Sequence, residues 1–508
     1  MCGIIGYIGR NEAAPILLKG LKNLEYRGYD SVGMATLDDS LRLFRFRAVG
    51  KLEQATQNLD LKEMPGNVGM GHTRWATHGS VTESNAHPHI DCRNEIVIVH
   101  NGIIENYREL KDWLSARGHN FSSSTDSEVI AHLIEQYLIE AGSFEQAFME
   151  ALARLDGSYA ILAIFGDEKK ILAARKDSPL VIGLSDDGTY FASDVSALLD
   201  WTKSVVFLQN YDVVVAERDS IRFYNLLQEG EIEREAYNVM WDAEQAKKGQ
   251  FEHFMLKEIS EQAETIYRAI QQDKEVVQDI LEKVRKAKGV FFVGCGSSYN
   301  ACLAGSYLFS RVAGIHVNLA LASEFENYRH FLTQDTLVFA ISQSGETADV
   351  LDAVRAARRQ GAQVIAITNV VGSSLTREGD MMLLMNSGPE ICVLSTKTYT
   401  SQVVLMAFLA YCLVGRGEEC IRSIKDLYMD IYNLTSKSMR DELRGLAELL
   451  AGREHMFMIG RGLQYATAME AALKVKEVSY IHTEAFAGGE LKHGPLALID
   501  IDTPVFVF

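Results

Sequence analysis

The chain has 508 residues, of which 47% are hydrophobic and 23% charged, and its formal net charge is −18. Its length allows two to four domains with full cores, and its acidic balance argues against broad nucleic-acid binding. Seven scattered cysteines without a C-x-x-C pair indicate a reducing compartment and no cysteine zinc site, and the lack of a signal peptide or bilayer-spanning apolar run predicts a cytoplasmic protein.

The first six residues, MCGIIG, place Cys2 directly after the initiator methionine. Removal of Met1 would leave a first residue that carries both a thiol and a free α-amine. Because an α-amine titrates near pH ~8, it can take the proton of the thiol on its own residue, as in N-terminal threonine enzymes. The apolar residues that follow predict a buried strand. The alternative is that Cys2 is an ordinary buried cysteine.

A helix over residues 11–24, a polar glycine-containing loop and a strand over residues 32–37 follow. Residues 68–89 then hold four of the thirteen histidines, His72, His78, His87 and His89. No acidic residue except Glu83 stands among them at a ligand spacing, so we expect no metal site there. Arg74 suits a small carboxylate, because a guanidinium fork matches its geometry, and Trp75 beside it could cover a bound ligand.

A strand over residues 95–100 is expected to end at Asn101-Gly102. An Asn amide and a Gly backbone N–H at a strand end can supply two donors to an oxyanion, or the pair can be a simple turn. Further on, Thr125-x-x-Glu128 fits a capping box at the start of a helix. Asp126 is then either part of that cap or a partner for an ammonium group.

Six short motifs occur in order, namely MCGI, YRGYDS, HTRWATHG, NAHPH, HNGIIEN and TDSE. They resemble the class-II, or N-terminal-nucleophile, glutamine amidotransferases. This resemblance implies an α+β fold of the αββα sandwich type over residues 2–218, with Cys2 as the nucleophile and Asn101 with the Gly102 amide as the oxyanion hole. The other residues that it assigns are Arg74, Thr77, His78 and Asp126 for holding glutamine and Trp75 for gating the ammonia path.

Residues 219–285 predict a last strand, a linker and a docking helix. From Gly289 onward, strands, glycine-containing turns and helices alternate, which predicts an α/β doubly wound parallel sheet. Neither G-x-G-x-x-G nor a P-loop is present in the turns, so a nucleotide is not expected. Hydroxyls and backbone N–H groups at helix starts suit one compact phosphate instead.

An internal repeat is visible in this half. The segment FFVGCGSSYNA at 291–301 aligns with FMIGRGLQYAT at 457–467, so that Gly294 and Gly296 recur as Gly460 and Gly462. Two copies of one lobe are therefore predicted, and the second copy stops at the residue that matches Ile341. If the copies were equal in length, on the order of 100 residues would be missing. We therefore expect the chain to be a C-terminally truncated fragment.

The second half resembles the pair of sugar isomerase (SIS) domains, with lobes at 286–430 and, incomplete, at 452–508. The residues that this resemblance assigns to the phosphate and sugar pocket are Ser298, Ser342, Gln343, Ser344, Thr347 and Ser395. It also implies Glu477 as the base that moves a proton between sugar carbons, Lys474 beside that base, and His493 as a ring-opening acid lent by a partner subunit. By spacing alone, Lys474 and Glu477 describe an ordinary i, i+3 salt bridge.

As a whole, the chain resembles the glutamine–fructose-6-phosphate aminotransferase family. This resemblance implies amination and isomerisation of fructose 6-phosphate to glucosamine 6-phosphate, with glutamate as by-product, by a homodimer without cofactor, metal, nucleic acid or membrane. The family's basic C-terminal tail carries a Schiff-base lysine that this chain lacks. The alternatives are another class-II amidotransferase, a glutaminase alone, and a sugar-phosphate-binding regulatory protein with idle catalytic residues.

Overall fold

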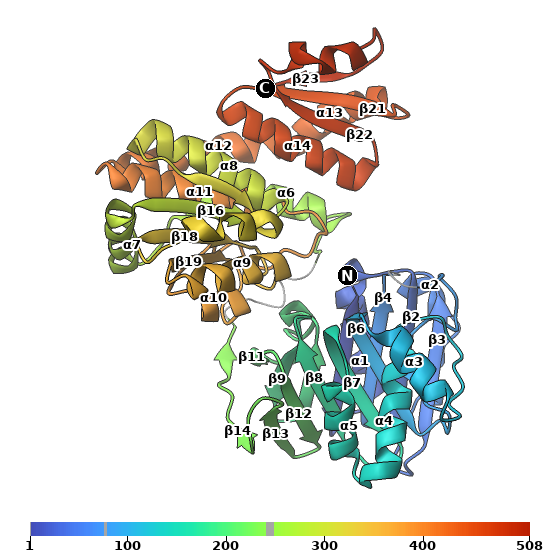
Figure 1. Cartoon of the computed structure of the whole chain (residues 1–508). Coiled ribbons are helices and arrows are strands. Elements are labelled where there is room, and N and C mark those ends of the chain that lie inside the picture. Colours follow the sequence, from blue (N-terminus) through green and yellow to red (C-terminus); the bar gives the residue numbers. More distant parts are fainter. Residues whose placement is uncertain (1, 76–78, 240–247) are drawn as a thin grey trace. The chain divides into compact units, whose positions relative to one another are not determined.

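The computed structural model describes residues 2–75, 79–239 and 248–508. The chain divides into two units, Met1–Ala246 and Lys247–Phe508, and each is described by itself (Figure 1). Over the described ranges, none of the helices combines the length and the apolar character that a membrane crossing requires.

The first unit is built on two antiparallel sheets. The first sheet has the order β15-β11-β9-β10-β1-β4-β2-β3, and its strands in that order are Tyr237–Asn238, Ser204–Phe207, Val181–Ser185, Gly188–Ala192, Gly3–Gly9, Val68–Arg74, Ser31–Leu37 and Leu43–Val49. The second has the order β14-β13-β12-β8-β7-β6-β5, and its strands are Glu231–Ile232, Ser220–Asn225, Asp212–Glu217, Ile171–Lys176, Gly157–Phe165, Ile96–Ile104 and His89–Ile90. The sheets of this unit thus continue past residue 218.

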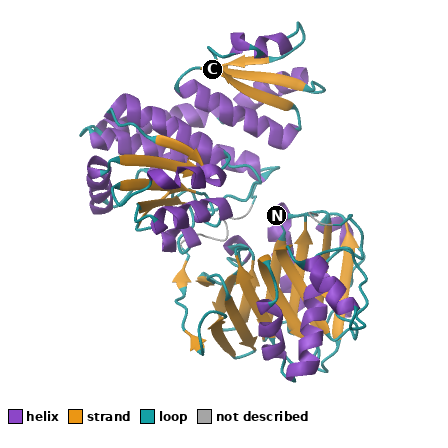
Figure 2. Ribbon diagram, viewed as in Figure 1, coloured by secondary structure: helices purple, strands orange, loops and turns teal. Residues whose placement is uncertain are grey.

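Helices cover the outer faces of both sheets, as Figure 2 shows. Helix α1 (Ala13–Leu24) packs on the first sheet, and α3 (Tyr107–Ser115), α4 (Glu128–Ala141) and α5 (Phe144–Ala153) pack on the second. The inner faces meet in a core of aliphatic side chains such as Ile4, Val97 and Leu162. This layering confirms the predicted αββα sandwich.

Strand β1 occupies the middle of the first sheet. It pairs with β4 on one side and β10 on the other, with Gly3 opposite Thr73 and Ile5 opposite Ala192. All seven of its residues are buried, which accounts for an uninterrupted run of isoleucine, glycine and tyrosine instead of a polar–apolar alternation. The strand therefore anchors Cys2, the residue directly before it.

The second unit holds two parallel sheets. The larger has the order β17-β16-β18-β19-β20, with strands Asn318–Leu321, Gly289–Gly294, Thr336–Ile341, Gln363–Thr368 and Met381–Leu384. The smaller has the order β22-β21-β23, with strands His482–Ala487, His455–Gly460 and Val505–Val507. The helices of this unit are α6 Phe254–Ala269, α7 Lys274–Lys286, α8 Ser297–Leu308, α9 Ala348–Arg359, α10 Ser374–Glu378, α11 Lys397–Leu413, α12 Gly417–Leu434, α13 Lys437–Leu450 and α14 Leu463–Ser479.

Alternate residues of each central strand point to opposite faces of the larger sheet. On β18, Leu337 and Phe339 join the core shared with α7, α8 and α11, whereas Val338 and Ala340 join the core shared with α9 and α10. Helices therefore cover both faces, and the predicted doubly wound sheet is confirmed.

The repeat seen in the sequence has a counterpart in the backbone. Gly296 precedes α8 with φ 54° and ψ −125°, and Gly462 precedes α14 with φ 62° and ψ −126°. Both values lie where a residue with a Cβ is strained. The order β17-β16-β18 in the first lobe also matches β22-β21-β23 in the second. The two segments are copies of one strand–turn–helix unit.

Candidate active site

The start of the chain lies against the end of β4. The backbone N–H of Trp75 donates to Cys2 Sγ at 3.3 Å, and the thiol lies 3.5 Å from the Trp75 carbonyl oxygen. Burial raises the pKa of the Cys2 thiol, and the hydrogen bond from Trp75 and the charges of Arg74 and Arg27 oppose that rise. The N–H and guanidinium groups around the thiol thus offset only part of the rise that burial causes.

Asn101 is positioned by contacts from three strands or strand ends. Its Nδ2 donates to the Cys2 carbonyl oxygen at 3.1 Å and to Ser193 Oγ at 2.7 Å, and its Oδ1 lies 3.0 Å from His72 Nε2. That nitrogen also lies 3.1 Å from the His100 carbonyl oxygen. Because both of its partners are acceptors, His72 carries its proton on Nε2. Burial lowers the pKa of His72 to about 3, so the ring is neutral.

The expected end of the strand at Asn101 is wrong, because β6 continues to Ile104 and pairs with β7 throughout. An Asn-Gly turn is thereby excluded. Gly102 has φ +130°, and a Cβ there would lie 2.0 Å from the Ser158 carbonyl oxygen. Only glycine fits this position in the strand, and its conformation lets Asn101 stay in the sheet.

Arg74 and Asp126 are buried, with exposed fractions of 4% and 5%. Burial lowers the pKa of Arg74, while the charges of Cys2 and Asp126 raise it. Asp126 Oδ2 accepts from the backbone N–H of Ile104 at 2.8 Å, which fastens the start of α4 to β6. Arg74 thus lies within reach of the charges of both the thiol and Asp126, and a guanidinium and a carboxylate are the pair that an amino acid's carboxylate and ammonium require.

The predicted capping box is wrong as well. Glu128 accepts from the backbone N–H and the hydroxyl of Ser122, and from the same two groups of Ser123, at 2.7 Å in each case. The side chain of Ser127, at the N-cap of α4, makes no capping bond. The carboxylate thus orders the loop before Asp126 in place of capping through Thr125.

The remaining predicted residues of this site have mixed outcomes. Thr77 and His78 lie outside the described residues. Trp75 is 42% exposed and meets Tyr29 edge-on, with ring centroids 5.2 Å apart. We expected no metal site among the histidines of residues 68–89. Three of them, His72, His87 and His89, are buried, and their rings pack against one another.

Two residues that the sequence did not single out help to build this site. Arg27 Nε donates to the Cys2 carbonyl oxygen at 3.0 Å, and its Nη1 lies 3.5 Å from Asp194 Oδ2. Ser193 Oγ accepts from the backbone N–H of Ile4 at 2.8 Å. Arg27 belongs to the motif YRGYDS, which was noted without a role for this residue, and Ser193 directly follows β10.

In the second unit, hydroxyls gather where strands of the larger sheet give way to helices. Ser342 Oγ lies 2.8 Å from Thr347 Oγ1 and accepts from the Gly345 backbone N–H at 3.1 Å. Ser344 Oγ accepts from the Glu346 N–H at 3.1 Å. Since α9 begins at Ala348, this turn places hydroxyls and N–H groups at a helix N-terminus, where an anion is favoured.

The other predicted pocket residues lie on neighbouring turns. Ser298, at the start of α8, accepts from Gln402 Nε2 at 3.1 Å, and Ser395 Oγ lies 2.7 Å from Thr398 Oγ1 before α11. Gln343 is half-buried beside Ser342. Because β16 and β18 are parallel neighbours, α8 and α9 begin at the same edge of the sheet, the usual ligand edge of such sheets.

Lys474 and Glu477 share one face of α14. Lys474 Nζ lies 2.7 Å from Glu477 Oε2 and donates to Ser297 Oγ at 3.0 Å. The structure adds Glu470, which is 5% exposed and accepts from Ser297 Oγ at 2.7 Å and Asn300 Nδ2 at 2.9 Å. A salt bridge is thus present, but it faces the start of α8 and is no isolated surface pair.

His493 is exposed in a short 3-10 helix, Leu491–His493. Over the described ranges, no hydrogen bond or ion pair joins its side chain to Lys474 or Glu477. The structure therefore does not bring this predicted residue to the other members of the sugar site within one chain.

The fold and the two sites define a glutamine amidotransferase unit followed by sugar isomerase lobes. The glutamine amidotransferase domain family matches residues 72–200, and the SIS domain family matches residues 283–411 and 449–508. The glutamine–fructose-6-phosphate aminotransferases (isomerizing) of Clostridium tetani and Pyrococcus horikoshii are each 44% identical to this chain, over 99% of it and 85% of their own length. The chain belongs to the glutamine–fructose-6-phosphate aminotransferase (isomerizing) family.

Among solved structures, the C-terminal domain of glucosamine-fructose-6-phosphate aminotransferase from Francisella tularensis is 35% identical. It covers 51% of this chain and 77% of its own, with a TM-score of 0.45. The family assignment stands on the sequence relatives.

Proposed function

We propose that this protein transfers the amide nitrogen of glutamine to fructose 6-phosphate and isomerises the product to glucosamine 6-phosphate, the first step of amino-sugar synthesis. One observation carries this proposal. A single chain joins a half-buried thiol near Asn101 and Arg74 to a hydroxyl-lined helix start with an acid–base pair, and it is 44% identical to aminotransferases of this name over 99% of its length.

In the glutamine site, Cys2 attacks the carboxamide carbon after Met1 has been removed. The α-amine takes the thiol proton and passes it to the departing ammonia, which leaves a thioester that water hydrolyses to glutamate. Asn101 Nδ2, which donates to the Cys2 carbonyl oxygen in this structure, donates instead to the oxyanion of the tetrahedral intermediate. The Gly102 backbone N–H donates a second hydrogen bond to that oxyanion. The remaining roles are carboxylate binding by Arg74, Thr77 and His78, ammonium binding by Asp126, and gating by Trp75.

In the sugar site, the start of α9 holds the phosphate through the hydroxyls of Ser342, Ser344 and Thr347. Ser298, Gln343 and Ser395 bind the rest of the sugar. Glu477 moves a proton between C2 and C1, and Lys474, 2.7 Å from its carboxylate, orients that carboxylate. We keep the lobe boundaries 286–430 and 452–508 as part of this proposal.

A homodimer belongs to the same proposal, since His493 makes no polar contact with Lys474 or Glu477 within the described parts of its own chain. His493 of one subunit would then open the sugar ring in the site of the other. Mixing a His493→Ala subunit with a Glu477→Gln subunit tests this arrangement. Restored turnover in the mixture supports a shared site, and two inactive parents that stay inactive after exchange refute it.

The decisive experiment supplies glutamine labelled with ¹⁵N in its amide, together with fructose 6-phosphate, to the protein expressed from its complete reading frame. We expect ¹⁵N in glucosamine 6-phosphate by mass spectrometry, with excess unlabelled ammonium diluting it little. Glutamate release without labelled amino sugar would leave only a glutaminase, and the transfer proposal would be wrong.

A further inference from the structure

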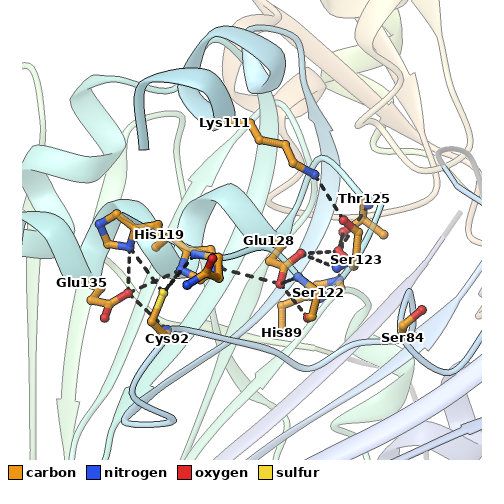
Figure 3. Close-up of polar contacts among 12 residues, drawn as sticks. Ser84, His89, Cys92, Lys111, His119, Ser122, Ser123, Thr125, Glu128 and Glu135 are labelled. Carbon is orange, nitrogen blue, oxygen red and sulfur yellow. Dashed lines mark hydrogen bonds and ion pairs between the residues drawn. The ribbon is translucent and has the colours of Figure 1, made fainter. Parts of the chain in front are cut away.

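Four metal-ligating side chains meet in the first unit on elements that the glutamine chemistry does not use. Cys92 lies in the turn between β5 and β6, His119 follows α3, and His132 and Glu135 lie on one face of α4 at i, i+3 spacing. Figure 3 shows Cys92, His119 and Glu135 turned toward one another. One ligand atom from each of the four lies within 4.8 Å of all the others.

The individual distances suit a tetrahedral ion. Cys92 Sγ lies 3.7 Å from His119 Nδ1 and 3.4 Å from His132 Nδ1. Glu135 Oε2 lies 2.9 Å from His119 Nδ1 and 3.4 Å from His132 Nδ1. Zinc bonds of about 2.0–2.3 Å place tetrahedral ligands roughly 3.3–3.7 Å apart. Three of these four spacings therefore fit such an ion as they stand, and the fourth needs a small outward movement of Glu135. The two remaining pairs among the four ligand atoms lie within 4.8 Å of each other.

The groups around the four ligands also suit an ion. His119 turns its other nitrogen, Nε2, to Gln136 Oε1 at 3.1 Å, and His132 turns its Nε2 to Glu128 Oε1 at 3.7 Å. For His119, this hydrogen-bond partner on the second nitrogen fixes the tautomer in which Nδ1 offers its lone pair inward, whereas Glu128 faces His132 Nε2 at ion-pair distance and makes no hydrogen bond to it. The backbone N–H of Asn120 approaches Cys92 Sγ at 3.4 Å, as N–H groups do around a thiolate.

We propose that Cys92, His119, His132 and Glu135 bind one divalent transition-metal ion, with zinc as the best match. Binding releases the thiol proton of Cys92, so a thiolate, a carboxylate and two neutral imidazoles balance the two charges of the ion. Four protein ligands fill a tetrahedral shell, which describes a closed structural site and not a catalytic one. Cys92 is exposed, and this exposure gives the ion a path from solvent.

The site would connect three parts of the first unit that no strand pairing joins. It links the β5–β6 turn and the segment after α3 to α4. Since α4 begins two residues after Asp126, a bound ion would hold in place the loop that carries a glutamine-binding carboxylate. We therefore expect the metal to raise thermal stability more than it alters the rate of thioester chemistry.

The test uses the whole protein, loaded with Zn²⁺ or Co²⁺ and dialysed against metal-free buffer. Elemental mass spectrometry should find about one ion per chain. The absorption spectrum of the Co²⁺-loaded protein should show a thiolate-to-cobalt charge-transfer band and the d–d bands of a tetrahedral ion. Cys92→Ser and His132→Gln should each lose both signals. Cys412→Ser, which changes a half-buried cysteine of the second unit, is the matched control and should lose neither.

A second measurement needs no variant. Alkylation of Cys92 in the unaltered protein, followed by peptide mass spectrometry, should slow at least tenfold when zinc is present and recover after chelation. The proposal is overturned if loaded protein retains no stoichiometric ion, if Cys92→Ser and His132→Gln retain as much as the control, or if zinc leaves the alkylation of Cys92 unchanged.

Discussion

The two units assemble their sites in opposite ways. In the first unit, Asn101 contacts Cys2 and Ser193, which lie 99 and 92 residues away in sequence. In the second unit, the hydroxyls of Ser342 and Thr347 are five residues apart within a single turn. The proposed glutamine site is thus a product of the whole sandwich, whereas the proposed phosphate site comes from a local strand-to-helix junction. This contrast predicts that a substitution in one site should leave the other site intact. It also predicts that the glutamine site should tolerate fewer substitutions than the phosphate site.

Cys2→Ala should have the largest effect. Glutamate release should fall about 1,000-fold or more, because no other group supplies the nucleophile, while the affinity for fructose 6-phosphate should stay unchanged. Placing one residue between Met1 and Cys2 should cause comparable loss by moving the amine off the nucleophile. Cys412→Ala is the control. If Cys2→Ala also weakened sugar-phosphate binding, the two sites would not be separable.

Gly102→Ala tests how strictly the sandwich holds its site. A Cβ at φ +130° would meet the Ser158 carbonyl oxygen at 2.0 Å, so unfolding free energy should fall by about 3 kcal/mol. Gly118→Ala is matched, because its φ is +96° but nothing lies within 4 Å of its Cβ position, and it should cost about 1 kcal/mol. Tryptophan fluorescence in urea follows this unit, since all four tryptophans of the chain lie within residues 75–241.

Ser344→Ala combined with Thr347→Ala should weaken fructose 6-phosphate binding by about 30- to 900-fold, since each of the two hydroxyls lost to a charged phosphate removes roughly 1–2 kcal/mol. Glutamine hydrolysis should be unaffected. Isothermal titration calorimetry measures the affinity, with Ser323→Ala, an exposed serine of the same unit, as control. Unchanged affinity in the double variant would place the phosphate at another turn.

The smallest effect concerns Glu258 on α6, whose carboxylate accepts from the N–H groups of Ile391 and Cys392. Burial, with the nearby charge of Glu390, raises the pKa of Glu258 to about 7. Because the folded-state pKa lies above the unfolded one, protonated Glu258 favours the folded state. The free energy of unfolding of the second unit should therefore fall by about 2 kcal/mol as pH rises from 5 to 8.

Glu258→Gln should flatten this dependence, because the amide oxygen still accepts both bonds and carries no charge. Urea unfolding by circular dichroism at pH 5 and pH 8, corrected for the first unit by tryptophan fluorescence, measures the difference. A variant as sensitive to pH as the parent would assign the effect to another carboxyl.

Sequence patterns predicted best what is local. The strand, glycine turn and helix around Gly296, and its copy around Gly462, follow from short-range rules, and both have the same backbone in the structure. Asn101-Gly102 was interpreted as a strand end because the pair is typical of turns. The strand continues only because β7 pairs with it across both residues, and this pairing is invisible to a short window of sequence.

Contacts between distant segments account for the other omissions. Ser193 and Glu470 acquire their roles through partners more than 90 residues away, and neither carries a local signature. The proposed metal ligands are separated by 27, 13 and 3 residues, so only the H-x-x-E pair on α4 was recognisable in advance. The resemblance to known families identified Cys2 and Lys474 from the sequence. Their hydrogen-bond partners could be identified only from the folded structure.

The place of β1 between β4 and β10 has a consequence for synthesis on the ribosome. Residue 192, the end of β10, is made about 190 residues after β1, which takes roughly 10–40 s at about 5–20 residues per second. Throughout that interval, the sheet cannot close around β1. A peptidase that removes the initiator methionine would therefore meet an accessible terminus on the nascent chain, and the α-amine that we propose as the catalytic base would be uncovered before the enzyme has a site in which to use it.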